Sequence, residues 1–458
     1  MAQALGIAAG GLADGDVIGV STDSRTLTAD ELFVAVRGEN FDGHAFVAEA
    51  MRRGATGAVV DREWARGPVP GDRLLEVDDT IEALIDLAGW YRDGFSPSVV
   101  GVTGSNGKTT TKDMAAAVLG ARYATLKTEG NYNNHIGVPH TLFRLDAGTE
   151  AAVVEIGMNH PGEIERLAGA AKPYVGVITN VAAAHLESMH DLETVARAKG
   201  ELLEALPADG VAVLNADDRL VMEQSDRGPS TVRTFGFGPD ADVRGSDVRD
   251  EGGAVRFALD GTDVALPVPG RHNASNALAA IAVGDALGVS REQSITALAS
   301  FEPTSNRMQV VRAGSWSILN DTYNANPGSV AAALETAVAL SKGEPVAAVL
   351  GDMLELGEAA REAHRDVGAL AARAALDRLF VTGEYAGDVR DGAVEAGMDP
   401  DRVVVDDKAA LPGGVAEALS GSAVILVKGS RGMRMEEVVE SLVALAPAGR
   451  PDVNPSIR

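Results

Sequence analysis

A glycine-rich turn between an apolar segment and a helix-compatible segment constrains this chain more than any other stretch. Residues 98–102 predict a buried strand, and residues 110–119 predict a helix. The turn between them is Gly104-Ser105-Asn106-Gly107-Lys108-Thr109, whose glycines allow backbone N–H groups to point inward at an anion. The sequence therefore predicts a phosphate-binding loop, with Lys108 reaching the terminal phosphates of a nucleotide and Thr109 holding magnesium.

The loop departs from the usual Gly-x-x-x-x-Gly-Lys-Thr pattern at one position, because Val102 stands where the first glycine is expected. A glycine-rich strand–helix turn with a solvated lysine is therefore an alternative to a nucleotide site. The surrounding motifs decide between the two.

Composition limits the partners of this chain. Its 458 residues include 66 acidic and 40 basic side chains, and the net charge of −26 argues against a nucleic-acid binder or a peripheral membrane protein. The absence of cysteine excludes disulfides, thiol nucleophiles and thiolate metal sites. The N-terminus lacks a basic leader, and no run of about 18 apolar residues occurs. We therefore expect a cytoplasmic protein without a membrane span.

Strands and helices alternate on both sides of the loop. Apolar segments at 151–156 and 175–180 are separated by helix-compatible stretches, which is typical of a parallel sheet with right-handed crossovers. The last third repeats the alternation without a phosphate loop, and a shorter α/β segment precedes the loop. We expect an α/β protein with a small N-terminal α/β domain, a central P-loop parallel-sheet ATPase domain and a C-terminal Rossmann-like domain, over residues 1–96, 97–311 and 312–458.

Two polar side chains follow central strands and are candidate metal ligands. Glu155 comes directly after an apolar run, at the strand end where ligands of parallel sheets collect. An acid there usually serves the magnesium of a bound nucleotide, and the alternative is a carboxylate that caps a helix. His185 follows the next strand, and a lone histidine is either structural or a metal or phosphate contact.

Lys199 occupies an unusual place on a predicted helix. At about 100° per residue it falls inside the apolar face formed by Val195, Leu202, Leu203 and Leu206. Burying an unpaired ammonium costs roughly several kcal/mol of folding free energy, because the charge loses its hydration. Lys199 must therefore snorkel, pair with a carboxylate or be chemically neutralised.

Two further polar groups have open interpretations. Asn273 and Asn276 share one face of a predicted helix, where they could pair with a base edge or cap the helix. The segment Ser21-Thr-Asp-Ser-Arg25 is either a binding loop or a solvated turn.

Several motifs occur together along the chain: Thr103-Gly-Ser-Asn-Gly-Lys-Thr-Thr110, Glu155, Asn180 with His185, Ala198-Lys-Gly-Glu201, His272-Asn-Ala-Ser-Asn276, Asn306-Arg-Met308 and Asn320-Asp-Thr-Tyr-Asn-Ala-Asn-Pro327. In order and spacing they resemble the Mur ligases, ATP-dependent amide-forming enzymes of peptidoglycan synthesis, over essentially the whole chain.

Within that family, four segments resemble the branch that adds D-alanyl-D-alanine to UDP-N-acetylmuramoyl-tripeptide. They are Asp23-Ser-Arg25 with 33–44, then 130–139, 155–163 and 350–357. The branch that adds diaminopimelate or lysine is the nearest relative, but its Asp-Asn-Pro motif is absent here.

The resemblance implies a site for ATP and magnesium. The phosphates would bind Gly104, Ser105, Asn106, Gly107, Lys108, Thr109 and Thr110, the adenine would lie near Asn273 and Asn276, and Arg307 and Asp321 would close the site. One magnesium would use Thr109 and Glu155. A second would use His185 and Lys199, the latter carbamylated in this family. The catalytic set would then be Lys108, Lys199, His185 and Glu155.

The resemblance also implies where the other substrates bind in a monomeric enzyme. UDP-N-acetylmuramoyl-tripeptide would contact Ser24, Arg25, Asn131, Asn133 and Asn134, and D-alanyl-D-alanine would contact Tyr323, Asn324 and Asn326. Because each of the three domains would hold one ligand, the domains must close to bring the ligands together, and we expect hinges near Ser96-Pro97 and Val311-Arg312.

Two alternatives remain at this point. One is a ligase of the same fold that adds a single amino acid to a UDP-muramoyl peptide, or a folylpolyglutamate synthase-like enzyme, although the Asp23-Ser-Arg25 motif argues against the folate version. The other is a P-loop ATPase switch without a carboxyl acceptor.

Overall fold

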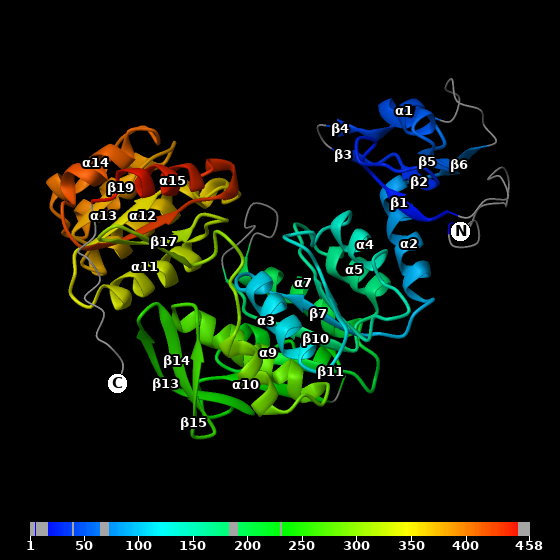
Figure 1. Ribbon diagram of the computed structural model, residues 1–458, viewed down its shortest axis with the longest axis horizontal. Coiled ribbons are helices and arrows are strands. Elements are labelled where there is room, and N and C mark those ends of the chain that lie inside the picture. The colour runs from blue at the N-terminus through cyan, green and yellow to red at the C-terminus, as the bar shows by residue number, and fades with distance from the viewer. Residues whose placement is uncertain are drawn as a thin grey trace.

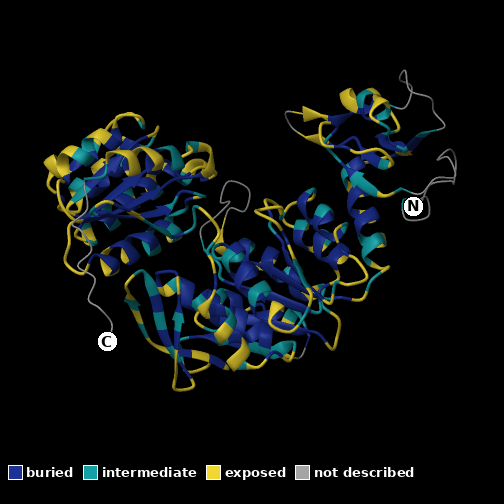
Figure 2. Ribbon diagram, in the orientation of Figure 1, coloured by how far each residue is buried: buried dark blue, intermediate teal, exposed yellow. Residues whose placement is uncertain are grey.

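The computed structural model describes most of the chain, namely residue 5 and residues 17–38, 41–64, 73–182, 191–229 and 231–447. The described residues form three α/β bodies arranged in an arc, with the central body between the N-terminal and C-terminal bodies (Figure 1). Each body has a buried core beneath an exposed outer face (Figure 2). The predicted three-domain α/β fold is confirmed. Across the described ranges, no helix is long and apolar enough to cross a membrane.

The N-terminal body is a small parallel sheet with strand order β1-β2-β5-β6. Its elements are β1 (Gly19–Ser21), β2 (Glu31–Val34), the hairpin β3 (Arg37–Gly38) and β4 (Phe41–Asp42), α1 (Val47–Arg52), β5 (Gly57–Asp61), β6 (Leu74–Val77) and α2 (Thr80–Arg92).

Helix α2 packs on the central body as well as on its own sheet. Asp79 caps its first turn by accepting from the N–H groups of Ile81 and Glu82. At its other end, Arg92 donates to the carbonyl of Ala171 at 3.0 Å. The predicted hinge near Ser96-Pro97 therefore follows a helix that is already held against the central body.

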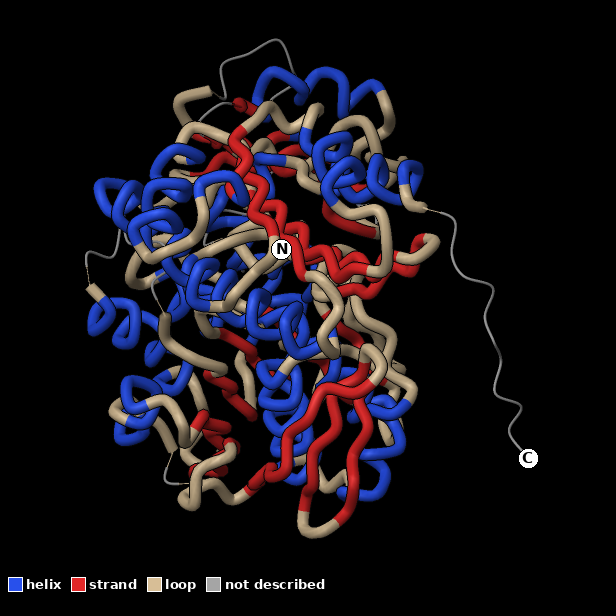
Figure 3. The backbone as a smooth tube through the Cα atoms, turned by 90° about the vertical axis from the view of Figure 1, so that its left-hand side faces the viewer, coloured by secondary structure: helices blue, strands red, loops and turns tan. Residues whose placement is uncertain are grey.

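The central body has a nine-stranded sheet in the order β15-β14-β13-β12-β11-β10-β7-β9-β8, parallel from β13 to β8. Its strands are β7 (Ser98–Thr103), β8 (Thr125–Lys127), β9 (Ala151–Glu155), β10 (Val175–Ile178), β11 (Val211–Asn215), β12 (Val232–Gly236), β13 (Val243–Glu251), β14 (Ala254–Leu259) and β15 (Thr262–Leu266). The antiparallel strands β13–β15 form a ribbon at the lower edge in Figures 1 and 3.

Helices cover both faces of this sheet because successive strand residues point to opposite sides. Val100 and Val102 of β7 pack with one helix layer, and Val99 packs with the other. The helices are α3 (Lys108–Gly120), α4 (Gly137–Leu142), α5 (Glu163–Ala171), α7 (Leu192–Glu204), α8 (Arg219–Met222), α9 (Arg271–Ala286) and α10 (Arg291–Ala299).

The C-terminal body is a six-stranded sheet with order β16-β17-β21-β18-β19-β20, parallel except for β16. Its elements are β16 (Gln309–Ala313), β17 (Trp316–Asp321), α11 (Pro327–Ser341), β18 (Val346–Leu350), α12 (Ala360–Arg373), β19 (Arg378–Val381), α13 (Ala386–Glu395), β20 (Val403–Val405), α14 (Leu411–Ala418), β21 (Ala423–Lys428) and α15 (Glu436–Leu445).

Strand β16 changes the expectation for the second hinge. Val311 pairs with Ile318 and Arg312 with Ser317 along a continuous antiparallel ladder. A bend at Val311-Arg312 would break this ladder. The expected division at residue 311 falls inside this strand.

Candidate active site

The phosphate-binding loop joins β7 to α3, and its two glycines are required by its geometry. Gly104 has φ +148°, and a Cβ there would lie 1.8 Å from Thr179 Oγ1. Gly107 begins α3 with φ +79°, and a Cβ there would lie 2.4 Å from Asn276 Oδ1. The loop backbone therefore approaches its neighbours more closely than any side chain permits.

The end of β10 holds the middle of the loop. Thr179 Oγ1 donates to the Asn106 carbonyl at 2.6 Å, and Asn180 Nδ2 donates to the same oxygen at 3.0 Å. Asn180 Oδ1 accepts from the Asn106 N–H at 2.9 Å. Ser105 Oγ donates to the carbonyl of Ala182 at 2.9 Å. These bonds give the loop one conformation before any ligand arrives.

Lys108 lies over its own loop. Its Nζ donates to the carbonyls of Gly104 at 2.7 Å and Ser105 at 3.2 Å. Burial lowers the pKa of Lys108, the charge of Arg307 lowers it further, and Glu155 opposes both. An anion bound on the loop would stabilise the charged form of this ammonium.

Glu155 ends β9 and is buried, with 1% of its surface exposed. Its Oε1 accepts from Asn133 Nδ2 at 2.8 Å. Its Oε2 is buried and has no hydrogen-bond partner among the described residues. Thr109, in the first turn of α3, is also buried. A buried carboxylate oxygen without a donor is a fitting ligand for a divalent cation such as magnesium.

Lys199 lies on the buried face of α7, as its place in the helical pattern predicts. It is 2% exposed, and none of the described acidic side chains is within ion-pair distance of its Nζ. Burial lowers its pKa well below the usual value, and the charge of Lys108 lowers it further. Burial thus disfavours the charged form of this amine. His185 lies outside the described residues, and the rest of the described chain contains no ready cluster of three metal-binding side chains.

The two asparagines of α9 bond to each other and to the phosphate-loop helix. Asn276 Oδ1 accepts from Thr111 Oγ1, and Asn276 Nδ2 donates to Asn273 Oδ1, each at 3.2 Å. Asn273 also donates to the carbonyl of Pro269 at 2.7 Å. These bonds fix both side chains beside α3.

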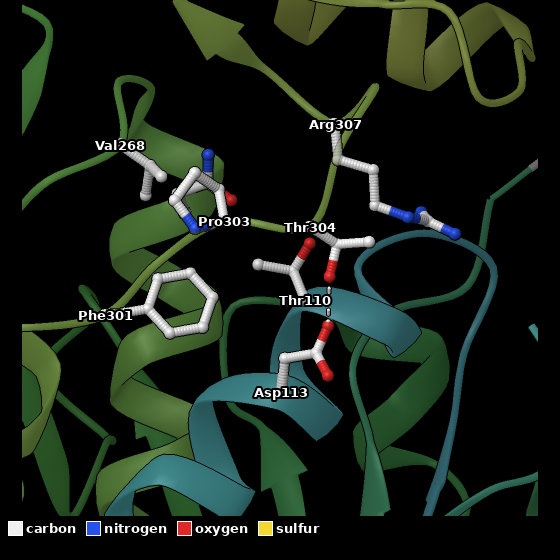
Figure 4. Close-up of a pocket in the computed structure, with 8 residues that line it drawn as sticks. Thr110, Asp113, Val268, Phe301, Pro303, Thr304 and Arg307 are labelled. Atoms are coloured by element: carbon white, nitrogen blue, oxygen red, sulfur yellow. Dashed lines mark hydrogen bonds between the residues drawn. The ribbon is translucent and has the colours of Figure 1, made fainter. Parts of the chain in front are cut away.

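A small pocket opens beside Asn273 (Figure 4). The phenyl ring of Phe301 and the Thr304–Asp113 hydrogen bond of 2.6 Å border it. Its lining residues are Thr110, Asp113, Val268, Asn273, Phe301, Pro303, Thr304 and Arg307. The expected nucleotide residues Thr110, Asn273 and Arg307 therefore meet at one place.

The C-terminal body reaches the phosphate loop through Asn326. This residue caps α11 by accepting from the Ser329 N–H at 2.8 Å, and its Nδ2 donates to Asn106 Oδ1 at 2.7 Å. The guanidinium of Arg307 stacks on the ring of Tyr323 at 3.8 Å. The contact between Asn326 and Asn106 joins residues that are 220 positions apart.

Two more expected residues of this body, Asp321 and Asn324, contact the buried side chain of Lys428. Lys428 Nζ bonds to Asp321 Oδ2 and donates to the carbonyl of Asn324 at 2.8 Å. Asp321 Oδ1 accepts from the Met308 N–H at 3.1 Å.

The N-terminal residues lie apart from the phosphate loop. Ser24 is buried, whereas Arg25 is exposed and pairs with Asp23 at 2.7 Å. Thr22 Oγ1 lies 2.9 Å from His140 Nε2 of α4, so this turn borders the central body.

Of the three asparagines expected to bind the UDP substrate, Asn133 donates its Nδ2 to Glu155 at 2.8 Å and its N–H to the carbonyl of Asn131 at 2.7 Å. Asn131 is exposed. Asn134 Oδ1 accepts from the N–H groups of Ile136 and Gly137 at 3.1 and 2.9 Å and so begins α4.

Lys112 was not singled out from the sequence, and Glu201 entered only as the last residue of the Ala198–Glu201 motif. Lys112 on α3 is buried and lies 3.9 Å from Glu155 Oε2. Glu201 accepts from the N–H groups of Gly162 and Glu165, which fixes α7 against the start of α5. Lys112 shares the helix face of buried apolar residues, so the reasoning applied to Lys199 would have found it.

Models of the Mur ligase family match three parts of the chain in order. They are the Mur ligase family catalytic domain over 16–89, the middle domain over 102–284 and the glutamate ligase domain over 306–431. A Bacillus subtilis relative, UDP-N-acetylmuramoyl-tripeptide–D-alanyl-D-alanine ligase, is 38% identical over 429 residues, which is 93% of each chain. The chain belongs to the Mur ligase family.

Another relative and two solved structures of Mur ligases are also similar to this chain. An Escherichia coli relative of the same name is 39% identical over 435 residues, covering 92% of this chain and 93% of its own. The crystal structure of MurF from Acinetobacter baumannii superposes with a TM-score of 0.88 at 32% identity, over 97% of both chains. MurF from Thermotoga maritima in complex with ADP has a TM-score of 0.84 at 29% identity, over 94% of this chain and 98% of its own.

Proposed function

We propose that this chain is an ATP-dependent ligase that joins D-alanyl-D-alanine to UDP-N-acetylmuramoyl-tripeptide, giving the pentapeptide precursor of peptidoglycan, ADP and phosphate. The observation that carries this proposal is the similarity, along nearly the full length of both chains, to relatives whose names give these two substrates. The phosphate loop beside two buried lysines and a buried carboxylate is consistent with such an enzyme.

ATP would bind between the central and C-terminal bodies. Its phosphates would lie on the loop from Gly104 to Thr110, and its adenine near Asn273 and Asn276. Arg307 and Asp321 would contact it from the C-terminal side. The pocket that Thr110, Asn273 and Arg307 line supports this placement.

Thr109 and Glu155 would hold one magnesium ion, and His185 and a carbamylated Lys199 would hold a second. When bound, magnesium offsets the negative charge of the phosphates and of the attacking carboxylate. The unpartnered Oε2 of Glu155 supports the first position.

Carbamylation would resolve the awkward burial of Lys199. The ammonium first gives up a proton, and the neutral nitrogen then attacks the carbon of carbon dioxide and releases a second proton to solvent, so that the side chain ends as an anion with two oxygen ligands. The lowered pKa of this amine, caused first by its burial, supports the reaction, because only the neutral form is a nucleophile.

The reaction would run through an acyl phosphate. A carboxylate oxygen of the tripeptide attacks the γ-phosphorus of ATP and ADP leaves, with Lys108 and the loop N–H groups countering the negative charge. The amine of D-alanyl-D-alanine then attacks the acyl carbon, the C–O bond to phosphate breaks, and the amine loses its proton. The chain's residues bind and orient both partners, and no covalent enzyme intermediate is needed.

The substrates would meet at the loop from two sides. Ser24 and Arg25 would hold the UDP end, and Asn131, Asn133 and Asn134 would border the peptide. From the C-terminal body, Tyr323, Asn324 and Asn326 would contact D-alanyl-D-alanine. We further propose a monomer that works in the cytoplasm, where its nucleotide substrates are made.

Omission of single substrates tests the proposal. The purified protein receives ATP and magnesium with UDP-muramoyl-tripeptide, with D-alanyl-D-alanine, or with both, using tripeptides that end in lysine or in diaminopimelate. We expect sustained ADP release and a UDP-pentapeptide only when both acceptors are present. ADP release that is independent of both acceptors would instead identify an ATPase switch.

A further inference from the structure

A second lysine of α3 is buried behind the phosphate loop. Lys112 stands one helical turn after Lys108 and is 1% exposed. Its Nζ donates to the carbonyls of Thr128 at 2.8 Å and Gly130 at 3.3 Å, and it lies 3.2 Å from Asp113 Oδ1. Two of these contacts are hydrogen bonds to backbone carbonyls, and the third is an ion pair.

The same ammonium lies beside Glu155. The distance from Lys112 Nζ to Glu155 Oε2 is 3.9 Å, and this oxygen has no hydrogen-bond partner among the described residues. The Glu155 N–H in turn donates to Thr128 Oγ1 at 3.1 Å. Lys112 therefore adds positive potential at the carboxylate oxygen that faces the proposed metal position, without occupying it.

The two carbonyls that Lys112 binds belong to the segment 128–134, which joins β8 to α4. This segment carries Asn133, whose Nδ2 holds the other oxygen of Glu155 and whose carbonyl accepts from the Gly157 N–H at 2.8 Å. Lys112 holds the near end of the segment, and Asn133 holds the far end.

Neutralising Asp113 does not by itself require Lys112. Asp113 Oδ1 also accepts from Lys127 Nζ at 2.7 Å, and its Oδ2 accepts from Thr304 Oγ1 at 2.6 Å. A buried lysine in addition to these partners is costly to desolvate. The contacts that distinguish Lys112 from Lys127 are those with the segment 128–134 and with Glu155.

We propose that Lys112 is a positioning residue that ties the nucleotide-binding helix α3 to Glu155 and to the segment 128–134. The inference rests on the proposed function, in which Glu155 holds magnesium and this segment borders the muramoyl peptide. Through Lys112, the helix that binds ATP and the segment that receives the acceptor keep one relative position.

The test compares Lys112→Met with Lys127→Met, a matched control that removes the other lysine from Asp113. We expect Lys112→Met to increase hydrogen exchange of the amides in 128–134 and to weaken magnesium binding, titrated in the presence of ADP, by about 10- to 100-fold. The KM for the UDP substrate should rise, while ADP binding without magnesium stays close to wild type. Lys127→Met should match wild type in each measurement.

Equal exchange and equal magnesium affinity in Lys112→Met and Lys127→Met would overturn the inference. Lys112→Gln is a second variant, which keeps a donor for one carbonyl but has no charge. It should protect the segment better than methionine does and keep more of the magnesium affinity, because the proposed effect comes from the hydrogen bonds with Thr128 and Gly130 rather than from the charge. Exchange and magnesium affinity in Lys112→Gln no better than in Lys112→Met would also overturn the inference. Hydrogen exchange needs no turnover, so the result stays decisive even if the acceptor-omission assay rejects the ligase.

Discussion

Replacing Gly107 with alanine tests the geometry of the phosphate loop. Gly107 has φ +79°, a conformation that costs an L-residue about 1–2 kcal/mol. The new Cβ would lie 2.4 Å from Asn276 Oδ1, which accepts from Thr111 Oγ1. Displacing Asn276 would lose this hydrogen bond, worth about 1 kcal/mol. We therefore expect the free energy of unfolding to fall by about 2–3 kcal/mol.

Gly162→Ala is the matched control. Gly162 also begins a helix with positive φ, +89°, but a Cβ there would have no atom within 4 Å. It should show the backbone cost alone, about 1–2 kcal/mol. Urea unfolding measures both losses, and calorimetric titration with ATP measures binding. We expect Gly107→Ala to lose about 1 kcal/mol more than Gly162→Ala and to bind ATP more weakly, while Gly162→Ala binds ATP normally.

The reasoning would be refuted if the two variants lost the same stability and bound ATP equally well. In that case the close approach of Gly107 to Asn276 would have no energetic consequence, and the loop would owe its glycine to backbone conformation alone.

Three further predictions concern the site. Glu155→Gln keeps the side-chain shape but removes the charge, so activity should fall at least about 100-fold and the magnesium requirement should rise; an unchanged magnesium titration would contradict it. With labelled bicarbonate, wild type should give a carbamate carbon signal by NMR that Lys199→Ala lacks, and full activity in Lys199→Ala would rule out the carbamate. Asn326→Ala should lose about 0.5–2 kcal/mol of stability with its helix cap. Asn326→Asp keeps the cap but replaces the donor to Asn106 with a negative charge, so stability should fall by about 1 kcal/mol and calorimetry should detect weaker ATP binding, and equal ATP binding would argue against this contact.

The parts of the site whose structure depends on residues close together in the sequence could be predicted from the sequence. The strand–loop–helix build around Lys108 depends on residues within about three turns, and the structure has it at β7 and α3. Lys199 could be placed in the core because helical periodicity alone puts it on the apolar face of α7. The confirmed α/β fold likewise follows from alternating periodic segments.

The remaining features depend on contacts between distant segments. Asn326 looks like a helix cap in the sequence, and nothing near it indicates that its Nδ2 reaches Asn106. Val311 and Arg312, where a hinge was expected, lie in β16 because they pair with β17, and a local sequence pattern does not show this pairing. Lys112 could have been found from periodicity, but its partners Thr128 and Gly130 come only with the fold.

The path of one oxygen atom tests the proposed ligation most directly. UDP-muramoyl-tripeptide with an isotopically heavy terminal carboxylate is converted in the presence of ATP and D-alanyl-D-alanine, and the released phosphate is analysed by mass spectrometry. Attack of the carboxylate on the γ-phosphorus, followed by expulsion of phosphate by the amine, predicts one heavy oxygen in each phosphate released. Phosphate without heavy oxygen, formed together with the pentapeptide, would contradict the acyl-phosphate account.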